Sequence, residues 1–300
     1  MDDETYLIVL GDMFDEGAES LEVTRLLRGL QHRNPGRVHV LMGNHEIILL
    51  RALSGVVEDL NWETTWSWAR RDDDFTRYLR SNGVPEISTE EMQSCFQRTY
   101  RETGVVLYPD HYTATAEQVS AEIRRNAARR LKECMIDDGT YQWISQLPAG
   151  IKIENWVFFH GGPPGESNLN VPELNKTIWD LVDSESWDDP RLAPYGSIES
   201  PMSTRNWAAE EQRVDQFLDR YDVDHIAFGH SPGALNGTFG VLCQKWGKVF
   251  KADSYIPLGI EGNLEIRDEC VWAIYSDCSI ENLFSLYPVG PSLNQRHQLK

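Results

Sequence analysis

The 300-residue sequence has no apolar run that approaches the roughly 18–20 residues of a membrane-spanning helix, so we expect no membrane span. Positive charge is also scarce, because 28 lysines and arginines stand against 47 aspartates and glutamates, which leaves a net charge of −19. Such a surface repels a phosphate backbone, and we therefore expect no nucleic-acid partner. A small phosphate substrate stays open, because a bound cation reverses the sign of the local field.

Cysteine is sparse as well, and no two cysteines form a C-x-x-C pair. The five are Cys95, Cys134, Cys243, Cys270 and Cys278. This scatter favours a reducing compartment over a disulfide framework or a thiolate zinc site. Met1 is followed by the acidic run Asp2-Asp3-Glu4, which does not resemble a signal peptide. We therefore expect a cytoplasmic protein.

Apolar residues make up 41% of the chain and charged residues 25%, a composition typical of a globular protein with a well-formed core. We predict one domain over residues 1–287. Residues 47–150 are expected to form a largely helical insertion that caps the site, because no Pro/Gly/Ser-rich linker bounds them. The polar residues 288–300 are expected to form a flexible tail.

Four short apolar runs are each followed at once by glycine or histidine and by polar side chains that can bind a metal. Runs of this length and composition predict buried strands. Ligands collected at the ends of core strands are how layered α/β folds build a site. The four runs, with the residues that follow them, are 6–10 before Gly11-Asp12, 38–42 before Gly43-Asn44-His45, 156–159 before His160, and 225–228 before Gly229-His230.

The segments between these predicted strands show helical periodicity. Leu21, Leu26, Leu27 and Leu30 predict an amphipathic helix over 18–33, with all four leucines on the inner face. A second helix is predicted over 117–135. The tryptophans at 62, 66 and 68 indicate a third helix that packs into the core. Residues 240–287 alternate in short runs typical of further strands.

The polar residues at the strand ends make a plausible metal-binding set. Asp12, Asn44, His160 and His230 offer one carboxylate, one amide oxygen and two imidazoles. This mixture suits manganese, iron or zinc and fits calcium or magnesium poorly. A carboxylate can also bridge two ions about 3.5–4 Å apart, the spacing of two-metal hydrolytic sites.

Two further residues suggest acid catalysis. His45 adjoins a ligand without being needed as one, so it can protonate a leaving alkoxide. Asp15, three residues after Asp12, can orient the imidazole of His45 and raise its pKa.

The ordered motifs G-D-M-F-D-E-G, G-N-H-E, H-G-G and G-H resemble those of the calcineurin-like metallophosphoesterases. Within that superfamily they resemble the phosphoprotein phosphatase group and its bacterial-type relatives, the Shewanella-like phosphatases and diadenosine tetraphosphatases. The resemblance implies an α/β (α+β layered) fold with two packed β-sheets flanked by helices. It also implies two divalent metal ions where the strand ends meet.

The same resemblance assigns roles to the residues. Asp12 would bridge the two ions, and Asn44, His160 and His230 would complete the second metal site. His45 and Asp15 would form the acid pair. Arg205, in the segment 200–207, resembles the arginine with which the family binds the substrate phosphate.

The chain departs from the family pattern at the first motif, D-x-H, because no aspartate has a histidine two positions later. We expect an N-terminal truncation, with a natural remnant as the alternative. Only Asp12 remains for the first ion, so we expect one well-held ion, manganese before iron or zinc. The neighbours of the missing strand are expected to expose unpaired edges. Glu16 and Met42 also stand where protein phosphatases carry arginine, and Glu16 is expected to weaken phosphate binding.

Several functions remain open at this stage. The first is a metal-dependent phosphatase of the serine/threonine protein phosphatase type, in which metal-activated hydroxide attacks a phosphate ester and His45 acts as general acid. The second is a phosphatase-like binding protein that has lost turnover. A dinucleoside polyphosphate hydrolase is a further alternative. The expected partner is a phosphoprotein or a small phosphate ester, and the negative charge disfavours a nucleic-acid phosphodiesterase.

Overall fold

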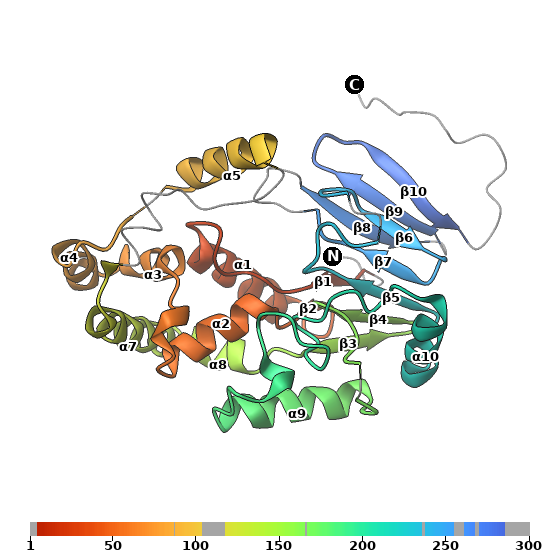
Figure 1. Cartoon of the computed structure of the whole chain (residues 1–300), viewed down its shortest axis with the longest axis horizontal. Coiled ribbons are helices and arrows are strands. Elements are labelled where there is room, and N and C mark those ends of the chain that lie inside the picture. The colour runs from red at the N-terminus through yellow and green to blue at the C-terminus, as the bar shows by residue number, and fades with distance from the viewer. Residues whose placement is uncertain are drawn as a thin grey trace.

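The computed structural model describes residues 5–86, 88–103, 118–165, 167–235, 238–254, 261–267 and 270–285. Within these ranges the chain forms three β-sheets with helices packed around them (Figure 1). The tail predicted at 288–300 lies outside the described residues. No helix formed by the described residues has the length and apolarity that crossing a membrane requires.

The largest sheet contains the third and fourth predicted strands. Its order is β3-β4-β5-β7-β6, and β4, β5 and β7 run parallel. Phe159 at the end of β4 pairs with Phe228 at the end of β5. Because parallel neighbours end at the same edge, the residues that follow β4 and β5 emerge side by side. The strands β3 to β7 span Gly150–Ile153, Trp156–Phe159, His225–Phe228, Cys243–Lys245 and Val249–Lys251.

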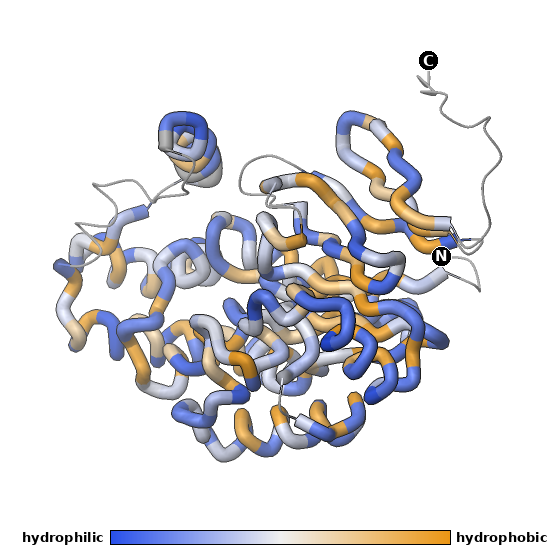
Figure 2. The backbone as a smooth tube through the Cα atoms, turned by 45° about the vertical axis from the view of Figure 1, so that its right-hand side comes forward, coloured by the Kyte–Doolittle hydropathy of each residue, from blue (hydrophilic) through white to orange (hydrophobic). Residues whose placement is uncertain are grey.

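The central strands of this sheet are buried on both faces, which explains why their sequences are continuously apolar. Trp156 and Phe158 of β4 belong to an apolar cluster on one face. Val157 and Phe159 point the other way, into the main core. Figure 2 shows hydrophobic residues concentrated along the strands at the centre of the molecule. The helices whose buried residues join the main core after β4 are α9 (Val171–Asp183) and α10 (Glu211–Tyr221), with the short 3-10 helix η2 (Pro190–Leu192) between them.

The first two predicted strands form a small parallel sheet, and the helix predicted over 18–33 lies between them in the chain. β1 (Leu7–Val9) pairs with β2 (Val38–Val40), and α1 (Ser20–Arg33) connects them. The inner face of α1 differs from the prediction in one residue, because Leu26 is 58% exposed. Its place on the buried face is taken by Thr24, which hydrogen-bonds within the helix.

A three-stranded antiparallel sheet follows near the end of the chain, in order β10-β9-β8. Its strands are β8 (Gly262–Arg267), β9 (Cys270–Tyr275) and β10 (Ile280–Ser285). Ile8 of β1 and Leu264 of β8 both pack against the cluster that contains Trp156 and Phe158. The two smaller sheets therefore lie over the same face of the five-stranded sheet and make a second layer.

Helices make up most of the described residues between β2 and β3 and lie beside the sheets (Figure 1). The predicted tryptophan helix is confirmed, because Trp62, Trp66 and Trp68 are buried and join the same core as the strands. Assignment of 47–150 as an inserted cap remains a prediction. These helices are α2 (Asn44–Leu53), α3 (Trp62–Ala69), α4 (Asp73–Ser81), α5 (Thr89–Thr103), α7 (Ala121–Asp137) and α8 (Thr140–Ser145), with the 3-10 helix η1 (Val57–Asp59).

Candidate metal centre

Two glycines allow the ends of β1 and β2 to approach each other closely. Gly11 has φ +103°, and a Cβ placed on it would lie 2.6 Å from the backbone nitrogen of Gly43. A Cβ on Gly43 would meet the Asp12 carboxylate oxygen Oδ1. Asp12 itself adopts φ +58°, a left-handed conformation that is costly for a residue with a side chain. This close backbone contact therefore brings Asp12 beside Asn44, the first residue of α2.

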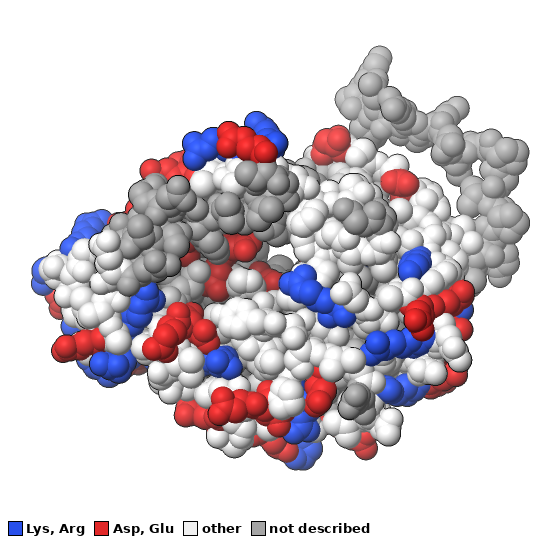
Figure 3. All heavy atoms as spheres, viewed as in Figure 1, with Lys and Arg blue, Asp and Glu red and all other residues white. Residues whose placement is uncertain are grey.

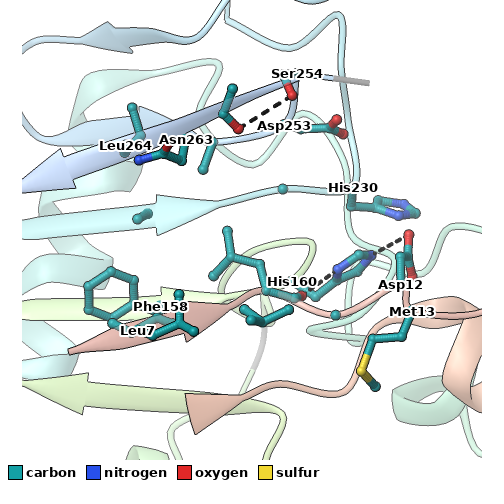
Figure 4. Close-up of a pocket in the computed structure, with 18 of the residues that line it drawn as sticks. Leu7, Asp12, Met13, Phe158, His160, His230, Asp253, Ser254, Asn263 and Leu264 are labelled. Atoms are coloured by element: carbon teal, nitrogen blue, oxygen red, sulfur yellow. Dashed lines mark hydrogen bonds and ion pairs between the residues drawn. The ribbon is translucent and has the colours of Figure 1, made fainter. Parts of the chain in front are cut away.

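The predicted metal-binding side chains meet at this point, as Figure 4 shows for Asp12, His160 and His230. One ligand atom from each of these three residues lies within 4.8 Å of the others. The Nε2 atom of His160 is 3.2 Å from the Asp12 oxygen Oδ2 and 3.1 Å from the Asn44 oxygen Oδ1. Residues separated by up to 218 positions thus converge because the ends of β1 and β2 in the small sheet meet the ends of β4 and β5 in the five-stranded sheet.

The hydrogen bonds of His160 leave its Nε2 atom as the one that would bind a metal ion. Its Nδ1 donates to the Leu10 carbonyl at 2.7 Å, so in the neutral ring Nε2 carries a lone pair. That nitrogen faces two oxygen atoms, which attract either a proton or a metal cation to this position. Burial lowers the pKa of His160, but Asp12, Glu46 and the Leu10 carbonyl together outweigh burial, so the net pKa is raised and Nε2 holds a proton in the metal-free protein. A divalent cation can take the place of that proton, as in metal sites where the other ring nitrogen of a histidine ligand donates to a carbonyl.

His230 supports the same conclusion. It has φ +61°, and its Nε2 atom is buried without a hydrogen-bond partner. Burial, with further contributions from His160 and Arg205, lowers the pKa of His230 to about 3. The ring is therefore neutral and free to donate its lone pair. The pKa of Asp12 is also lowered, because the charges of His160 and His45 outweigh desolvation. The donor set fits a divalent ion of the manganese, iron and zinc type.

His45 and Asp15 lie next to these residues and contact each other. The Nδ1 atom of His45 is 2.7 Å from the Asp15 oxygen Oδ2. Burial lowers the pKa of His45, but Asp12, Asp15 and Glu16 together raise it to about 10. His45 is thus an imidazolium at neutral pH in the metal-free protein. The backbone N–H of His45 also donates to Asp12 Oδ1 at 3.2 Å.

Thr64 supports the acid pair, and the sequence pattern did not identify it. Its hydroxyl donates to Asp15 Oδ1 at 2.7 Å and accepts from the Asp15 backbone N–H at 3.1 Å. Thr64 lies in α3, 49 residues from Asp15, so no local spacing links them. The helical segment therefore supports the site directly.

Glu46 is a second residue that sequence reasoning missed. Its fully buried carboxylate accepts hydrogen bonds from the backbone N–H groups of Asp12 (2.9 Å), Met13 (2.8 Å) and Gly43 (2.6 Å). One side chain thus joins the loop after β1 to the loop after β2. A signal for it exists, because glutamate at the third position of a helix often bonds back to the residue before the helix.

Arg205 and Glu16 line the same cavity as the metal-binding residues. Arg205 is exposed and donates to the Ser231 hydroxyl at 3.1 Å, beside His230. Burial raises the pKa of Glu16, and the charges of Asp12, Asp15 and Asp253 act in the same direction. On the face drawn in Figure 3, the coloured lysines and arginines are scattered among acidic side chains and form no continuous basic patch. The structure brings every predicted site residue to one cavity.

Comparison with known proteins agrees with this geometry. The family model for calcineurin-like phosphoesterases matches residues 2–234. A search of curated proteins found no match. Among solved structures, a cold-active protein-tyrosine phosphatase from a psychrophilic Shewanella species superposes with TM-score 0.57 and 20% identity, over 93% of this chain and 69% of its own. A second structure titled cold-active protein tyrosine phosphatase gives TM-score 0.57 and 19% identity, over 94% and 69% of the two chains. The predicted fold class is confirmed.

Proposed function

Because the chain belongs to the calcineurin-like phosphoesterase family, and so to the hydrolases of phosphoric esters, we propose that it cleaves a phosphoprotein or a small phosphate ester in the manner of a serine/threonine-type protein phosphatase. One observation carries the proposal. Asp12 Oδ2 and Asn44 Oδ1 both lie within hydrogen-bond distance of His160 Nε2, and the buried Nε2 of His230 beside them has no hydrogen-bond partner. Such a set is suited to a divalent ion of the manganese, iron and zinc type, and of these we propose manganese first.

We assign Asp12, Asn44, His160 and His230 as the residues that hold the ion. When bound, a divalent ion supplies a water of lowered pKa and neutralises charge on the phosphoryl oxygens. Among the described residues, one group of three histidine, cysteine, aspartate or glutamate side chains is close enough together to hold a metal ion, and it consists of Asp12, His160 and His230. We therefore propose one well-held ion per chain.

His45 is proposed as the general acid that protonates the leaving oxygen. The charge of Asp12 and the hydrogen bond to Asp15 keep a proton on the ring at neutral pH in the metal-free protein, and Thr64 holds Asp15 in place. Arg205 is proposed to bind the phosphate, because it is exposed to the same cavity. Glu46 positions Asp12 through the three backbone N–H groups that it binds.

We also propose that the helices between β2 and β3 form part of a cap over the site within a single domain. Gln93 of α5 lines the cavity, and the ring of Tyr100 on the same helix lies 5.4 Å from the ring of Phe239. A cytoplasmic location is proposed from the five free cysteines, which suit a reducing compartment.

The test is hydrolysis of an aryl phosphate after removal of metal with a chelator and addition of manganese, iron or zinc. We expect activity to return with metal, to be lost in His230→Ala together with metal binding, and to persist in His32→Ala, an exposed histidine on α1. His45→Ala should lose activity but retain the metal. A chain that binds metal and phosphate without turnover would favour the phosphatase-like binding protein. Preference for a dinucleoside polyphosphate over phosphopeptides would favour the third alternative.

A further inference from the structure

The backbone at His230 adopts a conformation that its surroundings must hold in place. His230 has φ +61°, in the left-handed region that costs free energy for a residue with a side chain. On its upstream side, the Gly229 N–H donates to the His160 carbonyl at 2.8 Å. The contacts that hold the chain after His230 therefore help to decide where its imidazole lies. We call residues 231–235, which follow it, the ligand loop.

Lys251 ends the strand that lies beside this loop. β5 and β7 are parallel neighbours (Figure 1), and Lys251 pairs with Phe228, two residues before His230. The Lys251 side chain is 0% exposed, which is rare for a lysine. Its Nζ atom donates to the Pro232 carbonyl in the ligand loop and to the Thr238 carbonyl at 3.2 Å. One buried amine thus binds two points of the chain that follows His230.

Packing alone does not account for a lysine at this position. Val249 of the same strand points into the main core, and strand alternation places Lys251 on that face. An apolar side chain would fill this buried space without the desolvation cost of an amine. Burial lowers the pKa of Lys251, while Cys243 and Asp253 act in the opposite direction. Both the ammonium and the neutral amine donate N–H bonds to carbonyls, so the contact with the loop does not depend on charge.

Neighbouring side chains bind the ligand loop at other points. Cys243 pairs with Lys251 across β6 and β7, and its Sγ atom lies 3.9 Å from the Ala234 carbonyl. Arg205 donates to the Ser231 hydroxyl at 3.1 Å. The described residues that line the cavity include Arg205 but not Lys251, so Lys251 acts on the site only through the loop.

We propose that Lys251 is a positioning residue that fixes the metal-binding orientation of His230 by holding the Pro232 carbonyl. The inference rests on the assignment of His230 as a metal ligand under the proposed function. Without the Nζ atom, the left-handed backbone at His230 is less firmly held, and its ring presents the Nε2 atom to the ion less often. Loss of groups that orient a metal ligand typically weakens metal affinity about 10–100-fold.

The test measures manganese affinity by calorimetry in Lys251→Met, which preserves an unbranched side chain and removes its N–H donors. We expect binding to weaken at least about tenfold. Lys245→Met is the matched control, because the Lys245 Nζ atom on β6 also donates to two carbonyls, those of Ala208 and Ala209, at 3.1 and 3.2 Å. Its metal affinity should not change. The visible absorption spectrum of the cobalt-loaded chain, which reports the ligands around the ion, should change in Lys251→Met alone.

Comparison with His230→Ala separates this inference from the proposed metal centre. In a His230→Ala background, adding Lys251→Met should weaken metal affinity no further, because Lys251 acts through that ring. Unchanged affinity in His230→Ala alone would reject His230 as a ligand, and this inference with it. Weakened binding in His230→Ala with unchanged affinity in Lys251→Met would leave the metal centre intact and overturn the role of Lys251 alone.

Urea unfolding measures the stability of each variant in parallel. Equal losses of metal affinity in Lys251→Met and Lys245→Met would show a general effect on the fold and would also overturn the proposal. Lys251→Gln is the second variant where Lys251→Met does not fold, because its shorter amide keeps N–H donors in the same buried space. We expect Lys251→Gln to lose metal affinity by an intermediate factor, and unchanged affinity in it would contradict the proposal.

Discussion

The support that Thr64 gives to the acid pair can be tested by replacing it with valine. The substitution keeps the shape of the side chain and removes the hydroxyl. It breaks a 2.7 Å hydrogen bond to the Asp15 carboxylate and a 3.1 Å hydrogen bond from the Asp15 backbone N–H. The first is worth about 1.5–3 kcal/mol and the second about 0.5–1.5 kcal/mol. We therefore expect the free energy of unfolding to fall by about 2–4 kcal/mol.

Thr24→Val is the matched control. Thr24 is as fully buried as Thr64, but its hydroxyl donates only to the Ser20 carbonyl, four residues earlier in α1. The helix already uses that carbonyl, so loss of the hydroxyl should cost less than about 1 kcal/mol. Urea unfolding curves of both variants give the comparison. Equal losses of stability in the two would refute the reasoning.

The same variant separates positioning from bulk stability through its pH profile. His45 must be protonated to act as an acid, so activity should decline as pH rises through its pKa in the loaded enzyme. Without Thr64, Asp15 bonds His45 less well and that pKa should fall. The alkaline limb of kcat should therefore move to lower pH in Thr64→Val and stay in place in Thr24→Val. An unchanged limb would mean that Thr64 has only a structural role.

Three further predictions concern charge and backbone. Because folding raises the pKa of His45 from 6.5 to about 10, this histidine stabilises the metal-free protein fully below pH 6.5, and the effect is lost as pH rises toward 10. His45→Gln should remove this pH dependence of the free energy of unfolding. An unaltered dependence on pH across the same window would contradict the prediction. Gly11→Ala adds a Cβ 2.6 Å from the backbone of Gly43, so the metal affinity measured by calorimetry should weaken at least about tenfold. Gly36→Ala is the control, because Gly36 has φ +76° but open space around it; it should lose about 1–2 kcal/mol of stability and no metal affinity. Glu16→Arg replaces repulsion by attraction, so inhibition by inorganic phosphate should strengthen about tenfold, with no change in the exposed Glu58→Arg.

The parts of the fold that could be predicted are those specified by short stretches of chain. The strands at 156–159 and 225–228 were located because buried parallel strands are continuously apolar and end at a glycine or histidine. The face of α1 was predicted less well, because counting leucines gave weight to Leu26 and none to Thr24. A threonine whose hydroxyl bonds its own helix is as easily buried as a leucine, and hydropathy does not register that bond.

The residues of the candidate site also differ in how well the sequence predicts them. Residues that would carry the chemistry stand directly after strands, and the common edge of the sheets brings Asp12, His160 and His230 together without further information. The groups that position them do not follow this rule. Thr64 reaches Asp15 across 49 residues, from a helix that packs beside the site. Such contacts depend on how separate helices and sheets pack, so no spacing within one motif encodes them. Substitutions at these positioning contacts should therefore change pKa values, metal affinity and stability while leaving every recognisable motif intact.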